Sequence, residues 1–450
     1  MLKAARIGEF LHRHKESVSI EPDHEYSLVT VKMHHKGVVL REKKKGVLLG
    51  SNMYRIKKGQ FILSGIDARQ GAFGIVPDEL DGAIITNDFW CFDVDERIVK
   101  RDFFYWLTST PLFLDACQKS SKGETQRIRL QKELFYAFEF RFPPINEQVS
   151  FLKRIRIYDD QLTSLDDEQD KQAGYLKALR QSILQEAIEG KLTAAWRKKH
   201  PYKKGDPERD GAALLERIRE EKNKLVAEGK IKKGKVLAPI EAGEEPFEIP
   251  EGWVWCRLGE ICSKIGSGST PRGGKYSDSG IPFFRSQNIY DGGIELDDIK
   301  YINDRQHQAM EGTSVNSNDL LLNITGGSLG RCASIPASLA AGNVSQHVCI
   351  IRPVLILQGA LHIVVRSPYF QKSIFASTTG AGREGLPKYN LELFYAPLPP
   401  LAEQTAIVER VEALLAHVDE LENEVASRKK LTGELMREVL REAFEGEGTV

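Results

Sequence analysis

The sequence has few cysteines and no long hydrophobic run. Its 450 residues include six cysteines, and no two of them form a CxxC pair, which argues against a zinc knuckle and against a disulfide framework. We therefore expect buried, reduced thiols. The first residues, MLKAARIGEFLHRHKESVSI, contain no apolar stretch long enough for a signal peptide or a membrane-spanning helix, so we expect a cytoplasmic protein without a membrane partner.

Net charge is also absent, because 63 basic residues balance 63 acidic ones. Lys plus Arg outnumber Asp plus Glu by 23 to 19 in residues 1–141 and by 13 to 11 in 253–397, whereas 398–450 carry 6 against 12. The small positive excess therefore lies outside the last segment. Such an excess alone is weak support for a nucleic-acid partner.

The motifs of several enzyme classes are missing. No Asn/Asp-Pro-Pro-aromatic motif accompanies a Gly-rich turn, as an amino-methyltransferase requires, and GSTPRGGKY (268–276) does not fit a P-loop. The acidic residues after Pro77 lack a nuclease lysine, and His34-His35 has no acidic or cysteine neighbours for a metal. We expect no catalytic residue and no metal site, a solvated or phosphate-contacting pair at His34-His35, and a core position for His347.

A repeat organises the chain. Residues 142–190 align without a gap with 398–446, with 13 of 49 positions identical, including both prolines and the Glu-Gln pair of FPPINEQ and LPPLAEQ. Each copy has apolar residues three or four apart, begins after Pro-Pro and stops at a glycine, so each predicts one long helix of about 65 Å at 1.5 Å per residue.

A lone helix of that kind needs a partner, and we predict that the two copies form an antiparallel coiled coil. Two unrelated exposed helices are the alternative. The predicted seam consists of Leu152, Ile155, Leu162, Leu165, Val408, Val411, Leu415, Val418, Leu421 and Val425.

The repeat extends upstream of the helices. Residues 60–94 match 319–353 in pattern, each with an apolar strand, a Gly-rich turn, a short piece ending in proline and a second strand, and ELFYA occurs at both 133–137 and 392–396. We predict an α+β, duplicated chain with two tandem mixed α/β domains. Its predicted segments are a first domain (1–141), a long helix (142–195), a charged helical linker (196–252), a second domain (253–397) and a second long helix (398–450).

Polar, Gly-rich loops in both domains suit DNA, because Arg and Lys bind phosphates or guanine edges and Asn or Gln can bind adenine. The predicted DNA-binding residues are Lys32, His34, Lys36, Arg69, Gln70, Lys122, Arg127, Arg129, Ser269, Thr270, Arg272, Arg285, Gln287, Asn288, Ser328, Arg383, Lys388 and Asn390.

These features together resemble the specificity subunit of a type I restriction-modification system, over essentially the whole chain. The resemblance rests on the two PPxxEQ helix starts and on the strings KGQFILSGIDARQGAFGIVPDELDGAIITNDF, GIPFFRSQNI, NDLLLNITGGSLGRCASIP, GAGREGLPKYNLE and EEPFEIPEGWVWCRLGEI. The first domain lacks the STP loop and the GIPFFR string, so contacts inferred for one domain are not transferred to the other.

The resemblance implies that each domain is a target recognition domain reading one half of a split double-stranded DNA site, with the helices, the spacer regions of the family, setting their separation. It implies two modification subunits, which bind S-adenosylmethionine and methylate adenine, and restriction subunits that use ATP and Mg. It implies no cofactor on this chain. Two alternatives are a coiled-coil scaffold that joins proteins without reading DNA, and an enzyme with a fused methyltransferase or nuclease.

Overall fold

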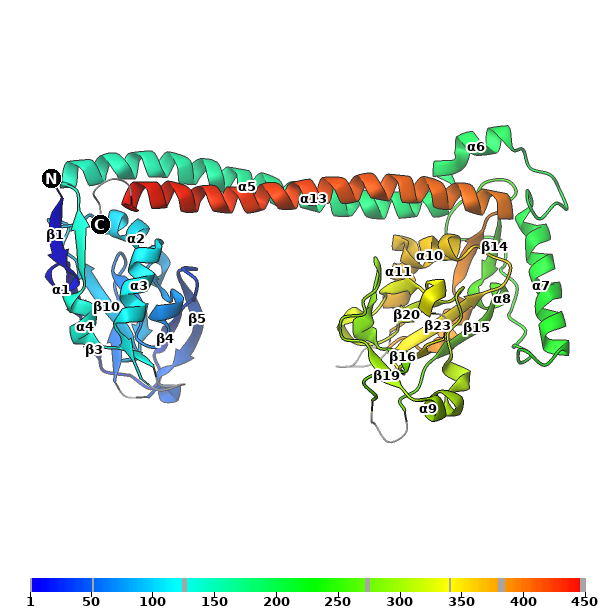
Figure 1. Ribbon diagram of the computed structural model, residues 1–450, viewed down its shortest axis with the longest axis horizontal. Coiled ribbons are helices and arrows are strands. Elements are labelled where there is room, and N and C mark those ends of the chain that lie inside the picture. The colour runs from blue at the N-terminus through cyan, green and yellow to red at the C-terminus, as the bar shows by residue number, and fades with distance from the viewer. Residues whose placement is uncertain are drawn as a thin grey trace. The chain divides into compact units, whose positions relative to one another are not determined.

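The computed structural model describes residues 2–50, 52–123, 128–271, 276–339, 341–378 and 385–445 (Figure 1). The chain divides into two compact units, the first made of residues 1–171 with 425–450 and the second of residues 172–424. Within the described ranges, no helix combines the length and the apolar content that crossing a membrane requires.

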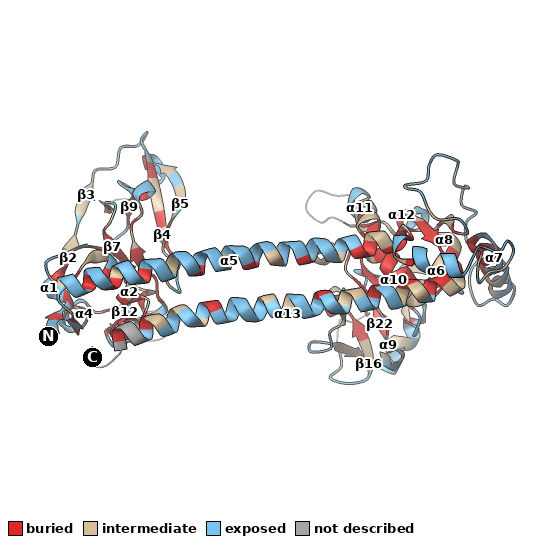
Figure 2. Cartoon of the chain, turned by 90° about the horizontal axis from the view of Figure 1, so that it is seen from above, coloured by how far each residue is buried: buried red, intermediate tan, exposed pale blue. Residues whose placement is uncertain are grey.

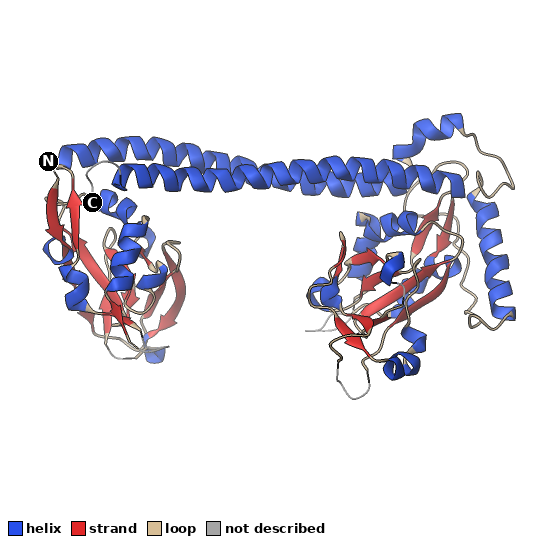
Figure 3. Cartoon of the chain, viewed as in Figure 1, coloured by secondary structure: helices blue, strands red, loops and turns tan. Residues whose placement is uncertain are grey.

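The first unit is a mixed α/β domain with part of both long helices (Figure 3). A four-stranded sheet has the order β2 (Leu11–His14), β10 (Phe89–Val94), β7 (Phe61–Ser64) and β8 (Phe73–Ile75). A five-stranded sheet has the order β3 (Glu16–Val18), β6 (Met53–Arg55), β9 (Ile84–Ile85), β4 (Glu25–Val31) and β5 (Val38–Lys45). Two antiparallel pairs complete the strands, β1 (Lys3–Arg6) with β13 (Glu139–Phe142) and β11 (Ser121–Lys122) with β12 (Arg129–Leu130).

Short helices connect and cover these strands in the first unit. They are α1 (Ile7–Phe10), α2 (Arg101–Thr108), α3 (Pro111–Lys119) and α4 (Lys132–Ala137), with 3-10 turns η1 (Gly46–Leu48), η2 (Ala68–Gln70) and η3 (Asp78–Leu80). The core is rich in phenylalanine: Phe61, Phe73, Phe104 and Phe113 are fully buried and contact one another edge-on or tilted. Such ring pairs stabilise a core beyond their buried area.

The second unit repeats the central four-stranded sheet. Its order is β15 (Cys262–Ser267), β23 (Val348–Pro353), β20 (Leu320–Asn323) and β21 (Cys332–Ser334), and β14 (Val254–Arg257) pairs with β24 (Tyr395–Leu398) as β1 pairs with β13. The other strands differ, being β19 (Lys300–Ile302), β16 (Ile281–Phe284) and β22 (Asn343–Val344) in one sheet and β17 (Ile289–Tyr290) with β18 (Gly293–Ile294) in another. The predicted α+β fold with a duplicated mixed domain is confirmed.

Four short helices of the second unit, α8 (Leu258–Ile261), α10 (Gln358–Arg366), α11 (Pro368–Ala376) and α12 (Lys388–Leu393), follow the order of α1 to α4, and α6 (Ala194–Lys199), α7 (Gly211–Ala227) and α9 (Asp304–Ala309) are additional. The unit also contains the 3-10 turns η5 (Ser286–Asn288), η6 (Glu311–Thr313), η7 (Gly326–Ser328) and η8 (Ala337–Leu339). After α5 (Ile145–Ile188) the chain forms η4 (Lys191–Thr193), α6 and α7, of which only α7 lies wholly in the predicted linker, 196–252. The six cysteines are buried thiols, as expected.

The long helices are α5 (Ile145–Ile188) and α13 (Leu401–Glu445), and each begins directly after Pro-Pro, as predicted. In the first unit, Gln169 hydrogen-bonds to Thr432 and Asp170 pairs with Lys429. In the second unit, Arg180 pairs with Asp419 and Glu422. Phe151 packs on Phe444 in the first unit as well, so α13 numbers fall as α5 numbers rise and the helices run antiparallel.

Every seventh residue of each long helix is buried or half-buried, whereas most of the helix surface is exposed (Figure 2). These positions are Gln148, Ile155, Leu162, Gln169, Leu176 and Ile183 in α5, and Gln404, Val411, Val418, Val425, Thr432 and Val439 in α13. The remaining predicted seam residues Leu152, Val408 and Leu415 are half-buried, each four residues after one of these positions. A seven-residue period is the period of a coiled coil.

The seam prediction is wrong at Leu165 and Leu421, whose side chains are 51% and 45% exposed. Each lies three residues after a buried position. Residue i+3 lies about 60° to one side of residue i on a helix, and residue i+4 about 40° to the other side. The partner helix covers the i+4 side, where Asp166 and Glu422 are half-buried, and leaves the i+3 side open.

Candidate nucleic-acid interface

In the first unit, polar groups gather where β7 ends and β10 begins. The amide of Gly65 donates to the carbonyl of Asp88 at 2.7 Å, and the amide of Leu130 donates to the carbonyl of Gly65 at 2.8 Å. This junction brings the carboxylate of Asp88 within 2.7 Å of the Arg129 guanidinium, with both side chains about half exposed. Lys122 lies opposite Arg129 across the β11–β12 pair.

The Asp88–Arg129 ion pair is suited to the recognition of base edges in DNA. Exposed pairs contribute only about 0–1 kcal/mol, so DNA groups can replace either partner at little cost. An arginine can then bind a guanine edge with two hydrogen bonds, and a carboxylate can accept from cytosine. Arg129 was among the predicted residues, whereas Asp88 was missed.

The turn between β4 and β5 carries three of the predicted residues, Lys32, His34 and Lys36, all exposed. It is held against η2, because the amide of His34 donates to the carbonyl of Gln70 at 2.9 Å. The turn and η2 lie so close together that a Cβ on Gly71 would be 3.2 Å from the backbone nitrogen of His35. The structure thus brings the turn together with Arg69 and Gln70 of η2.

His35 behaves differently from its neighbour. Both histidines have left-handed backbones, with φ of 60° and 57°, but the His35 ring points inward and lies 2.9 Å from the Thr108 hydroxyl, with Ser109 also within hydrogen-bond distance. Burial lowers the pKa of His35 to about 4, so the ring is neutral at pH 7. It therefore cannot serve as the phosphate-binding cation that the His34-His35 pair suggested.

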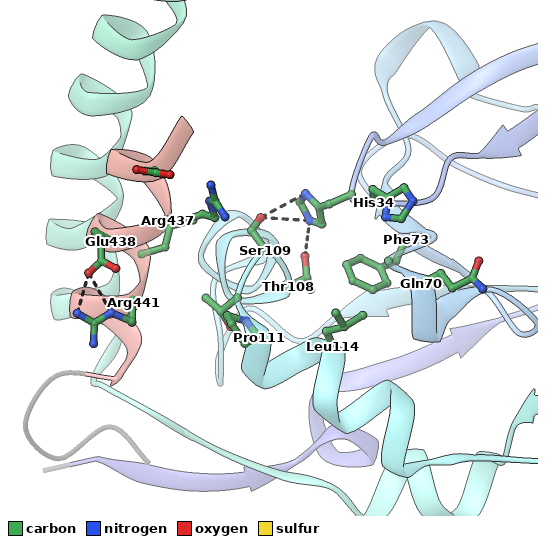
Figure 4. A pocket seen from close by; sticks show the side chains of 15 residues that line it. His34, Gln70, Phe73, Thr108, Ser109, Pro111, Leu114, Arg437, Glu438 and Arg441 are labelled. Carbon is green, nitrogen blue, oxygen red and sulfur yellow. Dashed lines mark hydrogen bonds and ion pairs between the residues drawn. The ribbon is translucent and has the colours of Figure 1, made fainter. Parts of the chain in front are cut away.

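A recess of about 530 Å³ lies beside this turn, entirely within the first unit (Figure 4). Its walls include Thr108 at the end of α2, Ser109 directly after it, the start of α3 and the α13 residues Arg437 and Glu438. Glu438 is paired with Arg441, and Nε of Arg437 donates to the carbonyl of Gly433.

In the second unit, the same backbone junction recurs. The amide of Ile324 donates to the carbonyl of His347 at 3.0 Å, and the amide of Leu386 donates to the carbonyl of Ile324 at 2.8 Å. The side chains at the junction differ from those of the first unit: the Thr325 hydroxyl is 2.7 Å from Nδ1 of His347, and Nε2 of Gln346 is 3.3 Å from Nε2 of the same ring.

The expectation that His347 is a core residue is wrong. The residue is exposed and precedes β23, because the strand begins only at Val348. Thr325, Gln346 and His347 were missed as a group. The alignment of Asn87 with Gln346 was the available signal, since it places an amide side chain before the same strand in both halves.

The STP loop joins this group. Gly268 packs so closely on β22 that a Cβ there would lie 1.8 Å from the carbonyl oxygen of Val344. The amide of Ser269 donates to that same carbonyl at 3.2 Å, and the Thr270 hydroxyl donates to Oε1 of Gln346 at 3.4 Å. The exposed Thr270, Gln346 and His347 therefore form one hydrogen-bonded row with the half-buried Thr325, able to offer donors and acceptors to base edges.

Two predicted contacts in the RSQN turn do not fit DNA binding. Asn288 is only 2% exposed, accepts from the amide of Arg285 and donates to the carbonyl of Glu295. Arg285 is mostly buried and paired with Asp298. Both side chains hold the turn together, whereas Gln287 is exposed, although its amide also donates to Asp298.

The remaining predicted residues divide into two sets. Ser328 accepts from the buried Asn323 amide and so supports the loop after β20, and Asn390 is half-buried in α12. Arg127, Arg272, Arg383 and the side chain of Lys388 lie outside the described residues. Among the residues that are described, no group of three or more His, Cys, Asp or Glu side chains is arranged to hold a metal ion.

Taken together, the fold is a duplicated α+β chain in which two domains present different polar groups on the same junction. Residues 11–173 and 250–428 match the family model described as the type I restriction modification DNA specificity domain. The chain belongs to this family.

Curated relatives carry related names. The chain is 27% identical over 384 residues to the type I restriction enzyme EcoAI specificity subunit of Escherichia coli, covering 74% of this chain and 62% of the relative. It is 32% identical over 204 residues to the EcoEI specificity subunit of Escherichia coli, covering 36% of this chain and 33% of the relative. The chain thus spans less than two thirds of the length of these two relatives.

Solved structures share the fold. A chain from work on complex assembly and conformational transition of the type I R-M system superposes with a TM-score of 0.70 at 17% identity, covering 100% of this chain and 98% of that one. The HsdS subunit from Thermoanaerobacter tengcongensis superposes with a TM-score of 0.50 at 18% identity, covering 99% and 97%.

Proposed function

We propose that this chain is the non-catalytic specificity subunit of a type I restriction-modification complex. Each mixed α/β domain binds one half of a split site in double-stranded DNA. The antiparallel helices set the spacer, which is the stretch of DNA between the two half-sites. Two modification subunits and the restriction subunits are the protein partners.

The observation that carries this proposal is the repeated junction with different side chains. Two backbone hydrogen bonds are equivalent in the two units, from Gly65 and Leu130 in one and from Ile324 and Leu386 in the other. On this common frame the first unit displays a carboxylate and a guanidinium, and the second displays hydroxyl, amide and imidazole groups. A duplicated frame with different polar groups is what reading two different half-sites requires.

The open side of the long helices supports protein partners. Exposed or half-buried apolar residues recur seven or fourteen positions apart, namely Tyr158, Leu165 and Leu179 on α5 and Leu414, Leu421 and Leu435 on α13. Such a row on a helix is a surface for further helices. We propose that the modification subunits dock there, and that the charged side chains around the row orient them.

Cofactor chemistry belongs, in this proposal, to the partners. S-adenosylmethionine would bind the modification subunits, and ATP with Mg the restriction subunits, with no cofactor on this chain. In this proposal the complex binds and modifies DNA in the cytoplasm. The five predicted segments, 1–141, 142–195, 196–252, 253–397 and 398–450, remain our proposed division into two readers, two spacer helices and a linker.

Duplex binding measured against salt tests the proposal against a scaffold that does not read DNA. With the modification subunits present, log affinity should fall steeply with log salt, by about 0.9 for each phosphate neutralised. A flat dependence would favour the scaffold. A fused methyltransferase or nuclease predicts turnover by the purified chain alone with S-adenosylmethionine or Mg, and our proposal predicts none.

A further inference from the structure

One buried layer of the helix pair is polar. Gln169 and Thr432, both in the first unit, are 7% and 9% exposed, and Nε2 of Gln169 donates to the Thr432 hydroxyl at 3.2 Å. The hydroxyl in turn donates to the carbonyl of Arg428. Oε1 of Gln169 has no hydrogen-bond partner among the described residues. The two side chains therefore hydrogen-bond to each other, and the buried oxygen of Gln169 without a partner lowers stability.

The repeat makes this layer unusual. At the equivalent positions, 256 residues away, Val425 replaces the glutamine and Leu176 replaces the threonine. The other positions of the seven-residue series are apolar, except for Gln148 and Gln404 at the starts of the helices. The polar pair is thus confined to one of two equivalent places.

We infer that Gln169 and Thr432 fix the register of the antiparallel helices and are positioning residues for the separation of the two domains. A buried polar residue in a coiled-coil seam specifies alignment at the expense of stability. The Asp170–Lys429 pair, with Nζ 2.5 Å from the carboxylate, lies beside the layer and agrees with the same register.

Shifted alignments of the two helices show why the polar pair favours a single register. A shift of one heptad would place Gln169 opposite Val425 or Val439, where its amide would be buried with no donor or acceptor facing it. An all-apolar seam has no such penalty, since valine and leucine pack acceptably in either alignment. The inference that these residues fix the register does not depend on the proposed function. The expected effect of the register on the DNA spacer does rest on that function.

Crosslinking on the full chain tests the inference without DNA. Asp170→Cys with Lys429→Cys reports the native register through a short bifunctional thiol reagent, and Asp170→Cys with Met436→Cys or with Glu422→Cys reports a one-heptad shift in either direction. The native cysteines are buried and should not compete. In the wild-type background only the native pair should crosslink.

The double variant Gln169→Leu/Thr432→Val should add crosslinks at a shifted pair, while its melting temperature rises by about 2–4 °C. Crosslinking confined to the native pair in this background would overturn the inference. Gln161→Leu/Thr163→Val makes the same replacements at exposed sites of α5 and should leave the crosslinks native.

The swapped variant Gln169→Thr/Thr432→Gln keeps one donor and one acceptor in the layer and should restore the native pattern. Shifted crosslinks in the swapped variant as strong as in the apolar one would also count against a role for the hydrogen bond. With modification subunits present, the apolar variant should accept more than one spacer length. A single retained spacer together with shifted crosslinks would contradict the proposed function and not the register.

Discussion

Gln148 and Gln404 join the long helices to the two domains in the same way. Oε1 of Gln148 accepts from the amide of Lys100, which precedes α2, at 2.7 Å, and Oε1 of Gln404 accepts from the amide of Leu357, which precedes α10, at 2.9 Å. Each Nε2 donates to a proline carbonyl at the start of its own helix. Both side chains are buried, so the glutamine of PPxxEQ fixes a domain to its helix.

Replacing either glutamine should loosen that junction. Gln148→Ala and Gln404→Ala each remove the side-chain partner of one backbone amide and one proline carbonyl, which should cost about 1–3 kcal/mol of unfolding free energy. Urea denaturation measures the loss. Gln161→Ala, at an exposed site of α5, should change stability by no more than about 0.5 kcal/mol. Equal effects at the buried and exposed sites would show that the junction does not contribute.

The two units should read separate half-sites. Arg129→Met removes the guanidinium beside Asp88 and should weaken binding by about 10- to 100-fold while relaxing base preference in one half-site. His347→Ala, which breaks the row through Thr325 and Gln346, should relax the other half-site only. Selection from a randomised DNA library measures both. Relaxation of both half-sites by one substitution would contradict separate reading.

Lys122 provides a matched test of backbone contact. It lies across the strand pair from Arg129 but, within the part of the chain that the structure describes, forms no ion pair with an acidic side chain. Lys122→Met should weaken all sequences about equally and lower the salt slope by about 1. A change in base preference would instead place Lys122 among the base-reading residues.

His35 should make the protein sensitive to mild acid. Its pKa in the folded chain is about 4, below the value near 6.5 expected when unfolded, so the unfolded chain binds the proton first. Stability should therefore fall as pH drops from about 6.5 toward 4. His35→Asn, which tolerates the left-handed backbone, should remove about 2–3 kcal/mol of this pH dependence.

The neighbouring histidine supplies the control for that measurement. His34 also has a left-handed backbone but is exposed, so His34→Asn should leave the pH dependence of unfolding unchanged. Denaturant titrations between pH 7 and pH 4 compare the three chains. If His35→Asn kept the full wild-type slope, burial of His35 would not be the cause of the acid sensitivity.

Replacing the two glutamates of PPxxEQ should have very different effects on stability, although both occupy the same position of the motif. Glu403 is buried and accepts from Trp253 and Thr193 while pairing with Arg197 of the linker, whereas Glu147 is exposed. Glu403→Gln should cost about 3 kcal/mol, because it leaves a largely buried guanidinium without its counter-charge. Glu147→Gln should cost under about 0.5 kcal/mol. Similar losses at both sites would argue against this role of the linker.

The helices and the duplicated sheet could be predicted because their signals are local. Pro-Pro followed by Glu-Gln marks a helix start, and alternating strands around a proline recur in both halves. The exposure of Leu165 and Leu421 could not be predicted, because spacing shows that a residue is near the seam but not on which side the partner helix lies.

The loop residues show a second limit. Asn288 and His347 are both polar residues near a strand end, yet the first is buried in its own turn and the second is exposed in a hydrogen-bonded row. Which of these occurs depends on partners distant in sequence, such as Glu295 and Thr325. Composition alone does not distinguish a polar side chain that holds a loop from one that faces DNA.

Lengthening the helix pair tests the central claim most directly. Inserting one heptad after residue 172 and another after residue 428 keeps the seven-residue series in both helices and adds about 10.5 Å to the pair. Selection from a library of split sites with variable spacers, with modification subunits present, should give the same bases in both half-sites and a spacer about 3 base pairs longer. Unchanged half-sites with an unchanged spacer would contradict the claim that the helices set the separation.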